Sequence, residues 1–371
     1  MDVIRAKASW AVRASHMSWV SKILIGCHGG GAGHATRSIA IARRIHEASP
    51  KTEIFFTCSG AGVKFIRMNG FRCLETPQPA ARMLDRAMGV DYSYKRIPFD
   101  AMAYFRKTFR LIRSFRPDIV VSDMDFAATV ISKMLGIPNF LISHLVERFF
   151  YPEVGILNYP KMVGLRVLYR CSYRIFVPDV LGLPIPEGLT DKSIRIGYLA
   201  CISKRSREPR NTAEQRILFV PSDMNRAMGD QILTELCKVP RARVLSRHRP
   251  SVDLENVEFV DPVPELSEHI AESDLIVCSG YTTVMEAVAA NRPCVLVPGN
   301  FEQSFIGSLG EAKGVLSVAK IQDLRSKVQR LLNDPETRDR MATSQLSVND
   351  GTQEVVRHVL SMGSEPQKEL M

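Results

Sequence analysis

The chain has 371 residues, of which 45% are hydrophobic and 24% charged, proportions typical of a globular protein of two domains. No apolar run approaches the roughly 20 residues of a membrane-spanning helix, which argues against a helical membrane domain. The formal net charge of +10 indicates an anionic partner, and nucleic acid, anionic lipid and sugar nucleotide all qualify.

Residues 1–21 differ in composition from the rest of the chain. They are rich in Arg, Ala and Ser, contain one acidic residue and lack the apolar core of a signal peptide. We expect this segment to be a poorly ordered extension outside the fold.

A strand, a glycine-rich turn and a helix are predicted in the first segment after this extension, KILIGCHGGGAGHATRSIAIARRI. Such a turn brings the backbone close to a neighbour or to a phosphorylated ligand. Neither the dinucleotide fingerprint nor the P-loop fits, because His34 stands where the first requires a glycine and the second a lysine. A tight turn without a ligand remains an alternative for this segment.

Alternating strands and helices then fill the first half of the chain. The apolar run at 118–125 is typical of a strand buried on both faces of a parallel sheet. The pattern indicates an α/β domain, and it breaks up between about 178 and 214, where we expect an interdomain connection. Further strands are predicted at 53–60 and 138–144, and helices at 61–70, 100–118 and 127–138.

A second α/β half begins at residue 215. Because ligands bind beyond the carboxyl ends of parallel strands, two such sheets facing one another are expected to form an interdomain cleft. The predicted strands of this half are 215–223, 242–248, 257–264, 274–280 and 293–299, and the predicted helices are 230–239, 265–273, 282–292, 323–334 and 352–363.

The eight cysteines are scattered and form no C-x-x-C pair, so the spacing of a zinc site is missing. Cys278 and Cys294 lie within apolar runs, which is typical of buried thiols in a reducing cytosol. We therefore expect a cytoplasmic protein.

The segment 272–314 contains the most informative polar residues. Its strand brings Gly280 to the sheet edge, and Thr282 or Thr283 is expected to cap the following helix. The N-terminus of that helix offers N–H groups and a positive dipole to a diphosphate. Glu286, in the early turns, can accept hydrogen bonds from ribose hydroxyls.

Glu302 and Gln303 follow the next strand, where a carboxylate and an amide can bind sugar hydroxyls. The residues of this segment resemble, at family spacing, the donor-binding domain of inverting GT-B glycosyltransferases. That group includes the UDP-glycosyltransferases and the family 28 peptidoglycan N-acetylglucosaminyltransferase. The glycine-rich loop that ends at His34 resembles the first loop of the same group, and GAGHATRS is similar to a prokaryotic branch of it.

The resemblance covers about residues 22–360 and implies an α/β protein of the GT-B fold, in which two Rossmann-like domains face one another across a cleft. It predicts an acceptor-side domain at 22–195 and a nucleotide-sugar-binding domain at 196–350, followed by a C-terminal helix and tail at 351–371.

The resemblance also implies the site residues. On the acceptor side it predicts a loop with His34 as the base that takes the acceptor proton, since imidazole titrates near neutral pH. The donor is expected to be a UDP sugar, and no metal or other cofactor is required. The loop residues are Gly30, Gly31 and Gly33, and the donor-binding residues are Gly280, Thr282, Thr283, Glu286, Glu302 and Gln303.

Asp123-Met124-Asp125 spells D-x-D, a metal motif of a different glycosyltransferase fold. Here the motif ends a predicted parallel strand, on which alternate residues face the same way. We expect Asp123 to contact the acceptor or His34, where it would orient the catalytic imidazole, rather than to bind a metal.

Two features depart from related patterns. Relatives often carry a glycine-rich turn after the first strand of the second domain, where this chain has Pro221, Ser222 and Asp223, and Asp223 would repel phosphate unless it points away. His248 in SRHRPS is similar to the His-Arg pair of nucleotide-sugar 2-epimerases, but it follows a different strand. We expect His248 to be structural or a cation at the cleft edge.

A basic helix and a later apolar segment can form a surface. The helix, within 105–116, is either a solvated face or a contact with anionic membrane at the inner face, and its aromatic residues either insert there or pack the core. The segment 148–170 is expected to be a mobile cleft or acceptor loop. The cations of the helix are Arg106, Lys107, Arg110, Arg113 and Arg116, and its apolar residues are Phe105, Phe109, Leu111 and Phe115.

The favoured function is inverting transfer of a sugar to a hydroxyl acceptor, for which a lipid-linked acceptor is one option. Inversion is favoured because retaining relatives usually carry a second Glu eight positions before the equivalent of Glu286, where this chain has Cys278. The alternatives are a nucleotide-sugar epimerase or hydrolase on the same fold, and a non-catalytic nucleotide-sugar-binding subunit. A nucleic-acid-binding protein is disfavoured, because both halves carry ordered site patterns.

Overall fold

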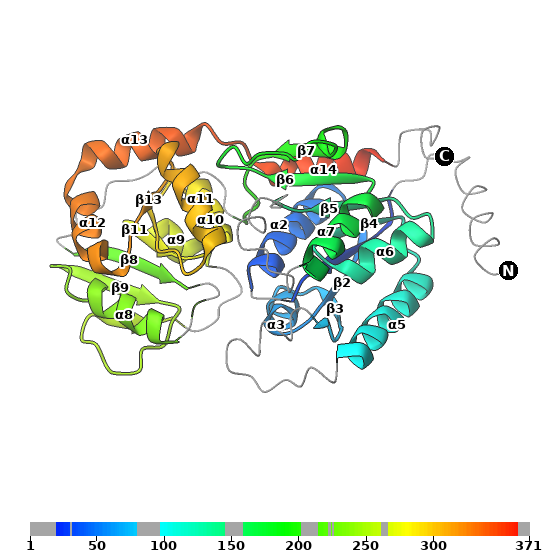
Figure 1. Ribbon diagram of the computed structural model, residues 1–371, viewed down its shortest axis with the longest axis horizontal. Coiled ribbons are helices and arrows are strands. Elements are labelled where there is room, and N and C mark those ends of the chain that lie inside the picture. Colours follow the sequence, from blue (N-terminus) through cyan, green and yellow to red (C-terminus); the bar gives the residue numbers. More distant parts are fainter. Residues whose placement is uncertain are drawn as a thin grey trace. The chain divides into compact units, whose positions relative to one another are not determined.

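The computed structural model describes residues 20–29, 32–79, 97–144, 159–201, 214–221, 224, 226–260 and 266–362. The chain divides into two compact units, whose elements are labelled in Figure 1. Unit 1 contains the residues up to Pro178, Pro184–Ile196 and the C-terminal segment from Gly351. Unit 2 contains Asp179–Leu183 and Gly197–Asp350, so the C-terminal helix groups with the first half of the chain. The expected extension lies outside the described residues, except for its last two positions.

Unit 1 is built on a seven-stranded parallel sheet with the strand order β3-β2-β1-β4-β5-β6-β7. The order changes direction between β1 and β4, which is where doubly wound sheets bind ligands. β3, β6 and β7 were not predicted, and β7 lies in the segment expected to be an interdomain connection. The strands are β1 (Lys22–Cys27), β2 (Glu53–Cys58), β3 (Arg72–Glu75), β4 (Ile119–Asp123), β5 (Asn139–Ile142), β6 (Arg174–Pro178) and β7 (Ser193–Ile196).

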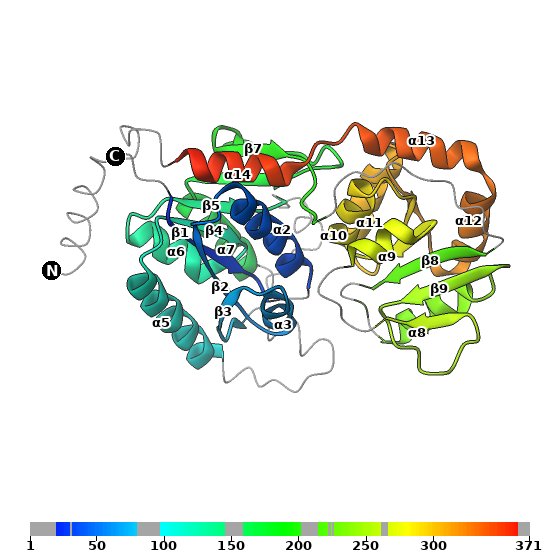
Figure 2. The ribbon, with the colours of Figure 1, turned by 180° about the vertical axis from the view of Figure 1, so that it is seen from behind.

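The helices of unit 1 form two packed groups. Helices α2, α3 and α14 pack in one group, and α5, α6 and α7 pack in the other. Figure 2 shows α2 beside α14, which are far apart in the sequence. Among the described residues, none of the helices combines the length and apolar character needed to cross a membrane. The helices are α2 (Gly33–Ala48), α3 (Ala61–Met68), α5 (Ile97–Phe115), α6 (Phe126–Met134), α7 (Tyr159–Cys171) and α14 (Gly351–Ser361).

The central strands of unit 1 are buried on both faces. Ile23, Leu24 and Ile25 of β1 have no exposed surface, nor have Val120 and Val121 of β4. Continuous apolar runs of this kind are expected only where helices cover both faces of a parallel sheet. The sheet edge reached by the polar residues that follow β1 and β4 is therefore supported by a rigid core.

Unit 2 has a six-stranded parallel sheet with the strand order β10-β9-β8-β11-β12-β13. Its strands are β8 (Gln215–Val220), β9 (Ala242–Ser246), β10 (Val257–Phe259), β11 (Leu275–Cys278), β12 (Cys294–Leu296) and β13 (Ser317–Val318). Its helices are α8 (Arg226–Leu236), α9 (Ser267–Glu272), α10 (Tyr281–Ala289), α11 (Phe301–Ala312), α12 (Ile321–Asn333) and α13 (Pro335–Leu346). Cys278 and Cys294 are buried thiols, as expected.

Candidate active site

His34 lies in the first turn of α2, beyond the carboxyl end of β1. The side chain of the N-cap residue, Ala32, makes no capping hydrogen bond, and His34 stands inside the helix rather than at its cap. The His34 Nδ1 atom lies 2.8 Å from Oδ1 of Asp123, the last residue of β4. Adjacent parallel strands bring these two residues together, because Cys27 of β1 is in register with Asp123. The His34 side chain is 25% exposed, whereas that of Asp123 is fully buried.

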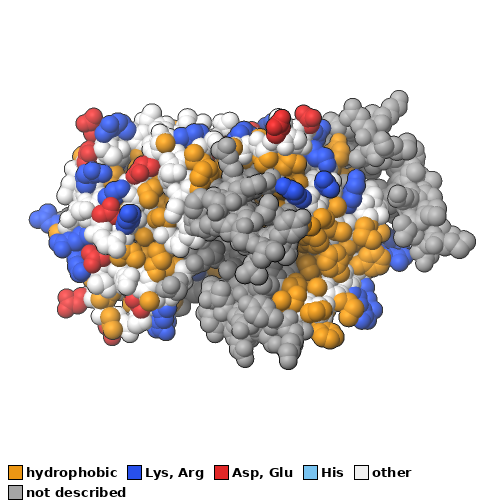
Figure 3. Space-filling model, viewed as in Figure 1, with side chains coloured by type: hydrophobic (Ala, Val, Ile, Leu, Met, Phe, Trp, Pro, Cys, Tyr) orange, Lys and Arg blue, Asp and Glu red, His pale blue; other side chains and the backbone are white. Residues whose placement is uncertain are grey.

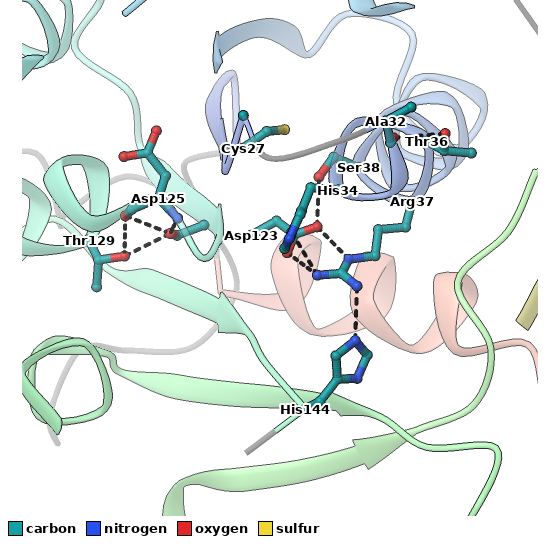
Figure 4. Close-up of polar contacts among 12 residues, drawn as sticks. Cys27, Ala32, His34, Thr36, Arg37, Ser38, Asp123, Asp125, Thr129 and His144 are labelled. Carbon is teal, nitrogen blue, oxygen red and sulfur yellow. Dashed lines mark hydrogen bonds and ion pairs between the residues drawn. The ribbon is translucent and has the colours of Figure 1, made fainter. Parts of the chain in front are cut away.

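Arg37, one helical turn after His34, was not predicted to belong to this site. Its Nε donates to Oδ2 of Asp123 at 2.5 Å, and its Nη2 donates to Oδ1 at 2.5 Å. The guanidinium therefore holds both oxygens of the carboxylate. Its Nη1 lies 2.9 Å from Nε2 of His144, which follows β5. Figure 4 shows His34 and Arg37 converging on Asp123, with His144 on the other side of the guanidinium.

Burial and the charge of Arg37 determine the charge states of Asp123 and His144. Burial alone would raise the pKa of Asp123, but the charge of Arg37 and the hydrogen bonds of Arg37 and His34 hold it well below its ordinary value. Burial and then the charge of Arg37 lower the pKa of His144 to about 3. His144 is therefore neutral at physiological pH, and its Nε2 can accept the hydrogen bond from Arg37.

The same distances allow two tautomers of His34. Its Nδ1 is 2.8 Å from Asp123 Oδ1 and 2.8 Å from Arg37 Nη2, and it cannot donate to one and accept from the other at once. Arg37 Nη2 lies closer to the carboxylate, at 2.5 Å. In the tautomer with the proton on Nδ1, that proton is donated to Asp123 and the lone pair is on Nε2. That nitrogen can act as a base.

Asp125 has a different role from Asp123, and the expectation that both face the same way is wrong. The strand ends at Asp123, and Met124 has a φ of 58°, which turns the chain. Figure 4 shows the two carboxyl groups pointing apart. Asp125 caps α6 by accepting from the Ala128 N–H at 2.9 Å, and it also accepts from the Tyr104 hydroxyl. Within the described ranges, no group of three or more His, Cys, Asp or Glu is placed to hold a metal ion.

Close packing requires at least one glycine of the glycine-rich loop. A Cβ added to Gly29 would collide with Ser59, so only glycine fits there. Its N–H donates to Oε1 of Gln78 at 2.7 Å, and Nε2 of Gln78 lies 3.3 Å from Oδ2 of Asp125. Asp125 thereby helps to fix the start of the loop. Of the predicted loop residues, Gly33 is the first residue of α2, and Gly30 and Gly31 lie outside the described residues.

In unit 2 three central strands end in register at the same edge of the sheet. Cys278 at the end of β11 is in register with Val220 of β8 and Leu296 of β12. Residues that follow these strands therefore lie along one edge of the sheet, as predicted for a ligand site.

Helix α10 begins at this edge without a capping side chain. Its N-cap is Gly280, which makes no side-chain hydrogen bond. Thr282 and Thr283 lie within the first turn, so the expectation that one of them caps the helix is wrong. The positive end of the helix dipole at this edge favours an anionic ligand.

Glu286 lies in the second turn of α10 and is 7% exposed. Burial raises its pKa from the ordinary 4.5 to about 7. A carboxyl group that titrates near neutral pH because it is buried, in an element that begins at a ligand-binding edge, is a candidate functional residue.

Glu302 and Gln303 lie in the first turn of α11. Asn300 caps this helix by accepting from the Gln303 N–H at 2.9 Å. The Gln303 side chain is mostly buried, and its Oε1 accepts from the Gly299 N–H at 2.6 Å. Gln303 therefore fixes the loop after β12, and its amide NH2 group is the part that can donate to a sugar hydroxyl.

His248 has a structural contact. Its Nε2 lies 2.9 Å from Oδ1 of Asp230, and Oδ2 of the same carboxylate accepts from the Ser251 hydroxyl at 2.6 Å. This contact joins the end of β9 to α8, one of the two roles expected for His248. In the loop after β8 that departs from the family pattern, Ser222 and Asp223 lie outside the described residues.

The basic helix α5 separates its aromatic and cationic residues. Phe105, Phe109 and Leu111 pack against the core of unit 1, and Phe115 is buried in it, so these side chains pack the core rather than insert into a membrane. The predicted cations of the helix and Arg116 just after it are exposed. Of the expected acceptor loop, 148–158 lies outside the described residues, and 159–170 lies within helix α7, so the expectation of a loop is wrong there.

Comparisons with known proteins agree on one class. The C-terminal domain profile of glycosyltransferase family 28 matches residues 230–355. A protein of Methanosarcina acetivorans named uncharacterized glycosyltransferase is 24% identical over 326 residues, which is 79% of this chain and 84% of the relative. The UDP-N-acetylglucosamine–N-acetylmuramyl-(pentapeptide) pyrophosphoryl-undecaprenol N-acetylglucosamine transferase of Nitratidesulfovibrio vulgaris is 25% identical, covering 74% of this chain and 76% of the relative.

Solved structures share the fold. Spinosyn forosaminyltransferase superposes with a TM-score of 0.67 at 17% identity, covering 94% of this chain and all (100%) of its own. A glycosyltransferase from Streptomyces nogalater gives a TM-score of 0.65 at 16% identity, covering 92% of this chain and 100% of its own. Both comparisons extend over both units.

Proposed function

For this chain, which is a glycosyltransferase with the GT-B fold and is similar to family 28, we propose inverting transfer of a sugar from a UDP-linked donor to a hydroxyl of a lipid-linked acceptor. The observation that carries the proposal is the hydrogen-bonded pair of His34 and Asp123 at the carboxyl edge of the unit 1 sheet. A partly exposed imidazole whose Nδ1–H is held by a buried carboxylate presents Nε2 as a general base.

In the proposed reaction His34 Nε2 takes the proton of the acceptor hydroxyl. The acceptor oxygen forms a bond to the anomeric carbon of the donor sugar as the bond from that carbon to the diphosphate oxygen breaks. A single displacement inverts the anomeric configuration. Cys278, where retaining relatives usually carry Glu, is a buried strand residue that offers no second carboxylate.

The donor would bind to unit 2. The uncapped N-terminus of α10 at Gly280 would stabilise the departing diphosphate through its N–H groups and dipole, without a metal. Thr282 and Thr283 belong to the same turn. Glu286 would accept from the ribose hydroxyls, and Glu302 and Gln303 would bind the sugar.

The names of relatives support the substrate classes. The N. vulgaris relative is named for a UDP-linked donor and for a pyrophosphoryl-undecaprenol acceptor. A donor of the same class agrees with the anion-binding helix terminus, and an acceptor of the same class agrees with the net charge of +10.

A peripheral contact with anionic membrane would bring unit 1 to such an acceptor. Figure 3 shows hydrophobic side chains gathered over the part of unit 1 that contains α5, α6 and α7. Phe99 and Met102 of α5 are 69% and 65% exposed, and Met134 of α6 is 59% exposed. Exposed apolar side chains beside cations are typical of surfaces that bind anionic lipid.

The direct test incubates the protein with a panel of UDP sugars and a bacterial or archaeal lipid extract, and identifies products by mass spectrometry. The expected result is a glycosylated lipid that forms only when donor and lipid are both present, and that His34→Ala does not form at a comparable rate. Donor that is hydrolysed or isomerised equally well without lipid would contradict the proposal and favour a hydrolase or an epimerase.

A further inference from the structure

Asp123 is a fully buried carboxylate that contacts two groups able to carry a positive charge. His34 Nδ1 is 2.8 Å from Oδ1, and Arg37 holds both oxygens at 2.5 Å. Arg37 is itself 3% exposed. A buried charge is tolerated only when it is paired and hydrogen-bonded, so one of the two groups must balance Asp123.

We propose that Arg37 is the permanent counter-ion of Asp123, so that His34 remains neutral and keeps Nε2 free to accept a proton. Arg37 is thus a positioning residue, which acts on the reaction through Asp123 and His34. The proposal rests on the proposed function only for the use of the free Nε2, because the charge arrangement itself is a property of unit 1.

The alternative arrangement shows why a counter-ion matters. If Asp123 and His34 were alone, the buried carboxylate would draw its balancing charge from the imidazole, which would become an imidazolium. An imidazolium donates from both nitrogens and has no lone pair for a substrate proton. A guanidinium keeps its charge throughout the working pH range, so it removes this demand from His34.

The surrounding groups are consistent with this role. The His28 ring centroid lies 5.2 Å from that of His34. Burial raises the pKa of the Cys27 thiol, which lies near Asp123, and burial lowers the pKa of His144 to about 3, so both stay neutral. Asp123 and Arg37 therefore form a pair that is neutral as a whole.

His144 also contacts the guanidinium of Arg37. Arg37 Nη1 is 2.9 Å from its Nε2, while Nε and Nη2 face Asp123. Groups on α2, at the end of β4 and after β5 thus fix the plane of the guanidinium. Arg and Lys are not equivalent in such a bidentate arrangement.

The test is ¹⁵N NMR of the histidine rings in the full-length protein at pH 7.5, with the His34 signals assigned by their loss in His34→Gln. In the wild type, His34 is expected to be neutral, with the proton on Nδ1. In Arg37→Met, with the same carboxylate but no counter-ion, His34 is expected to be protonated on both nitrogens. In Arg37→Met/Asp123→Asn, which removes both charges, the neutral ring is expected to return.

Return of the neutral ring in the double variant separates a charge role from simple packing. Arg44→Met is the matched control, because Arg44 lies on the same helix and pairs at the surface with Glu47. A charged His34 in the wild type, or a neutral His34 in folded Arg37→Met, would overturn the proposal. The wild-type spectrum decides even if Arg37→Met does not fold.

Turnover gives a second readout that is separate from the charge state. Arg37→Met is expected to lose at least about 10²-fold in turnover at pH 7.5, the lower range for a general base, with part of the loss recovered at higher pH. If the spectra are as expected but the wild type transfers no sugar, the counter-ion stands and the proposed function fails. If the wild type is active and His34 is charged in it, the counter-ion and the role of His34 as the base fail, while sugar transfer itself stands.

Discussion

Glu286→Gln is expected to stabilise the protein while it weakens donor binding. The pKa of this buried carboxyl is raised from 4.5 to about 7, so the folded state favours its neutral form. As pH rises from 4.5 to about 7, the unfolded chain ionises this group before the folded one does. The free energy of unfolding therefore falls over that window, by at most about 3 kcal/mol. Glutamine, which is neutral at every pH, does not carry this cost.

The donor should prefer the charged form, because a carboxylate accepts stronger hydrogen bonds from ribose hydroxyls than a neutral acid does. With a pKa of about 7, the charged fraction of Glu286 rises about tenfold between pH 6 and pH 8. Affinity for a UDP sugar should rise by up to the same factor. At pH 8, Glu286→Gln should weaken binding by roughly 1.5–3 kcal/mol, the range for bonds to charged groups, and should abolish this pH dependence.

Calorimetry with a UDP sugar at pH 6, 7 and 8, together with thermal unfolding at pH 4.5 and 8, measures both effects. The variant should melt near the wild type at pH 4.5 and several degrees higher at pH 8. Glu272→Gln is the matched control, because Glu272 lies in the same unit and its side chain is 51% exposed. A variant that binds donor as tightly as the wild type at pH 8 would refute the assignment of Glu286. A variant that is less stable at pH 8 would refute the electrostatic reasoning.

Four further results are expected. His34→Ala should keep its affinity for UDP and lose about 10²–10⁴-fold in turnover, and weaker UDP binding with normal turnover would contradict its role. Asp125→Ala should lower the free energy of unfolding by about 2–4 kcal/mol in denaturant titrations, because a helix cap and a buried hydrogen bond are lost. Chelators should leave the transfer activity of the wild type unchanged, and loss of transfer on chelation would contradict a metal-free reaction. Replacing Arg106, Arg110 and Arg113 with Glu should abolish co-sedimentation with anionic vesicles at low salt but leave UDP binding intact, and a wild type that ignores such vesicles would favour a soluble acceptor.

The sheets were predictable where the sequence is continuously apolar. The run that became β4 is buried on both faces, which follows from its composition alone. β7 was missed because SIRI is only four residues long and lies in a segment rich in prolines, glycines and charges. α11 was missed because Gly307 and Gly310 interrupt its helical pattern, although both allow close packing, against Val318 and Leu316.

The site was predictable only in part, because its remaining members depend on tertiary contacts. His34 and Asp123 could be named from their places after strands, but arginine is rarely buried, and Arg37 is buried because Asp123 lies beside it. The one-turn spacing of His34 and Arg37, and His144 directly after an apolar strand, are the signals that point to them. The D-x-D motif led to the wrong prediction that its two acids face the same way, because the turn at Met124 separates them.

The anomeric configuration of the product is the most direct test of inverting transfer by this protein. Transfer from an α-linked UDP sugar is followed by ¹H NMR, with the coupling constant at the anomeric proton of the purified product as the readout. Inverting transfer should give a β-linked glycoside that forms only when acceptor is present and that depends on His34. An α-linked product, or donor converted equally well without acceptor, would contradict it.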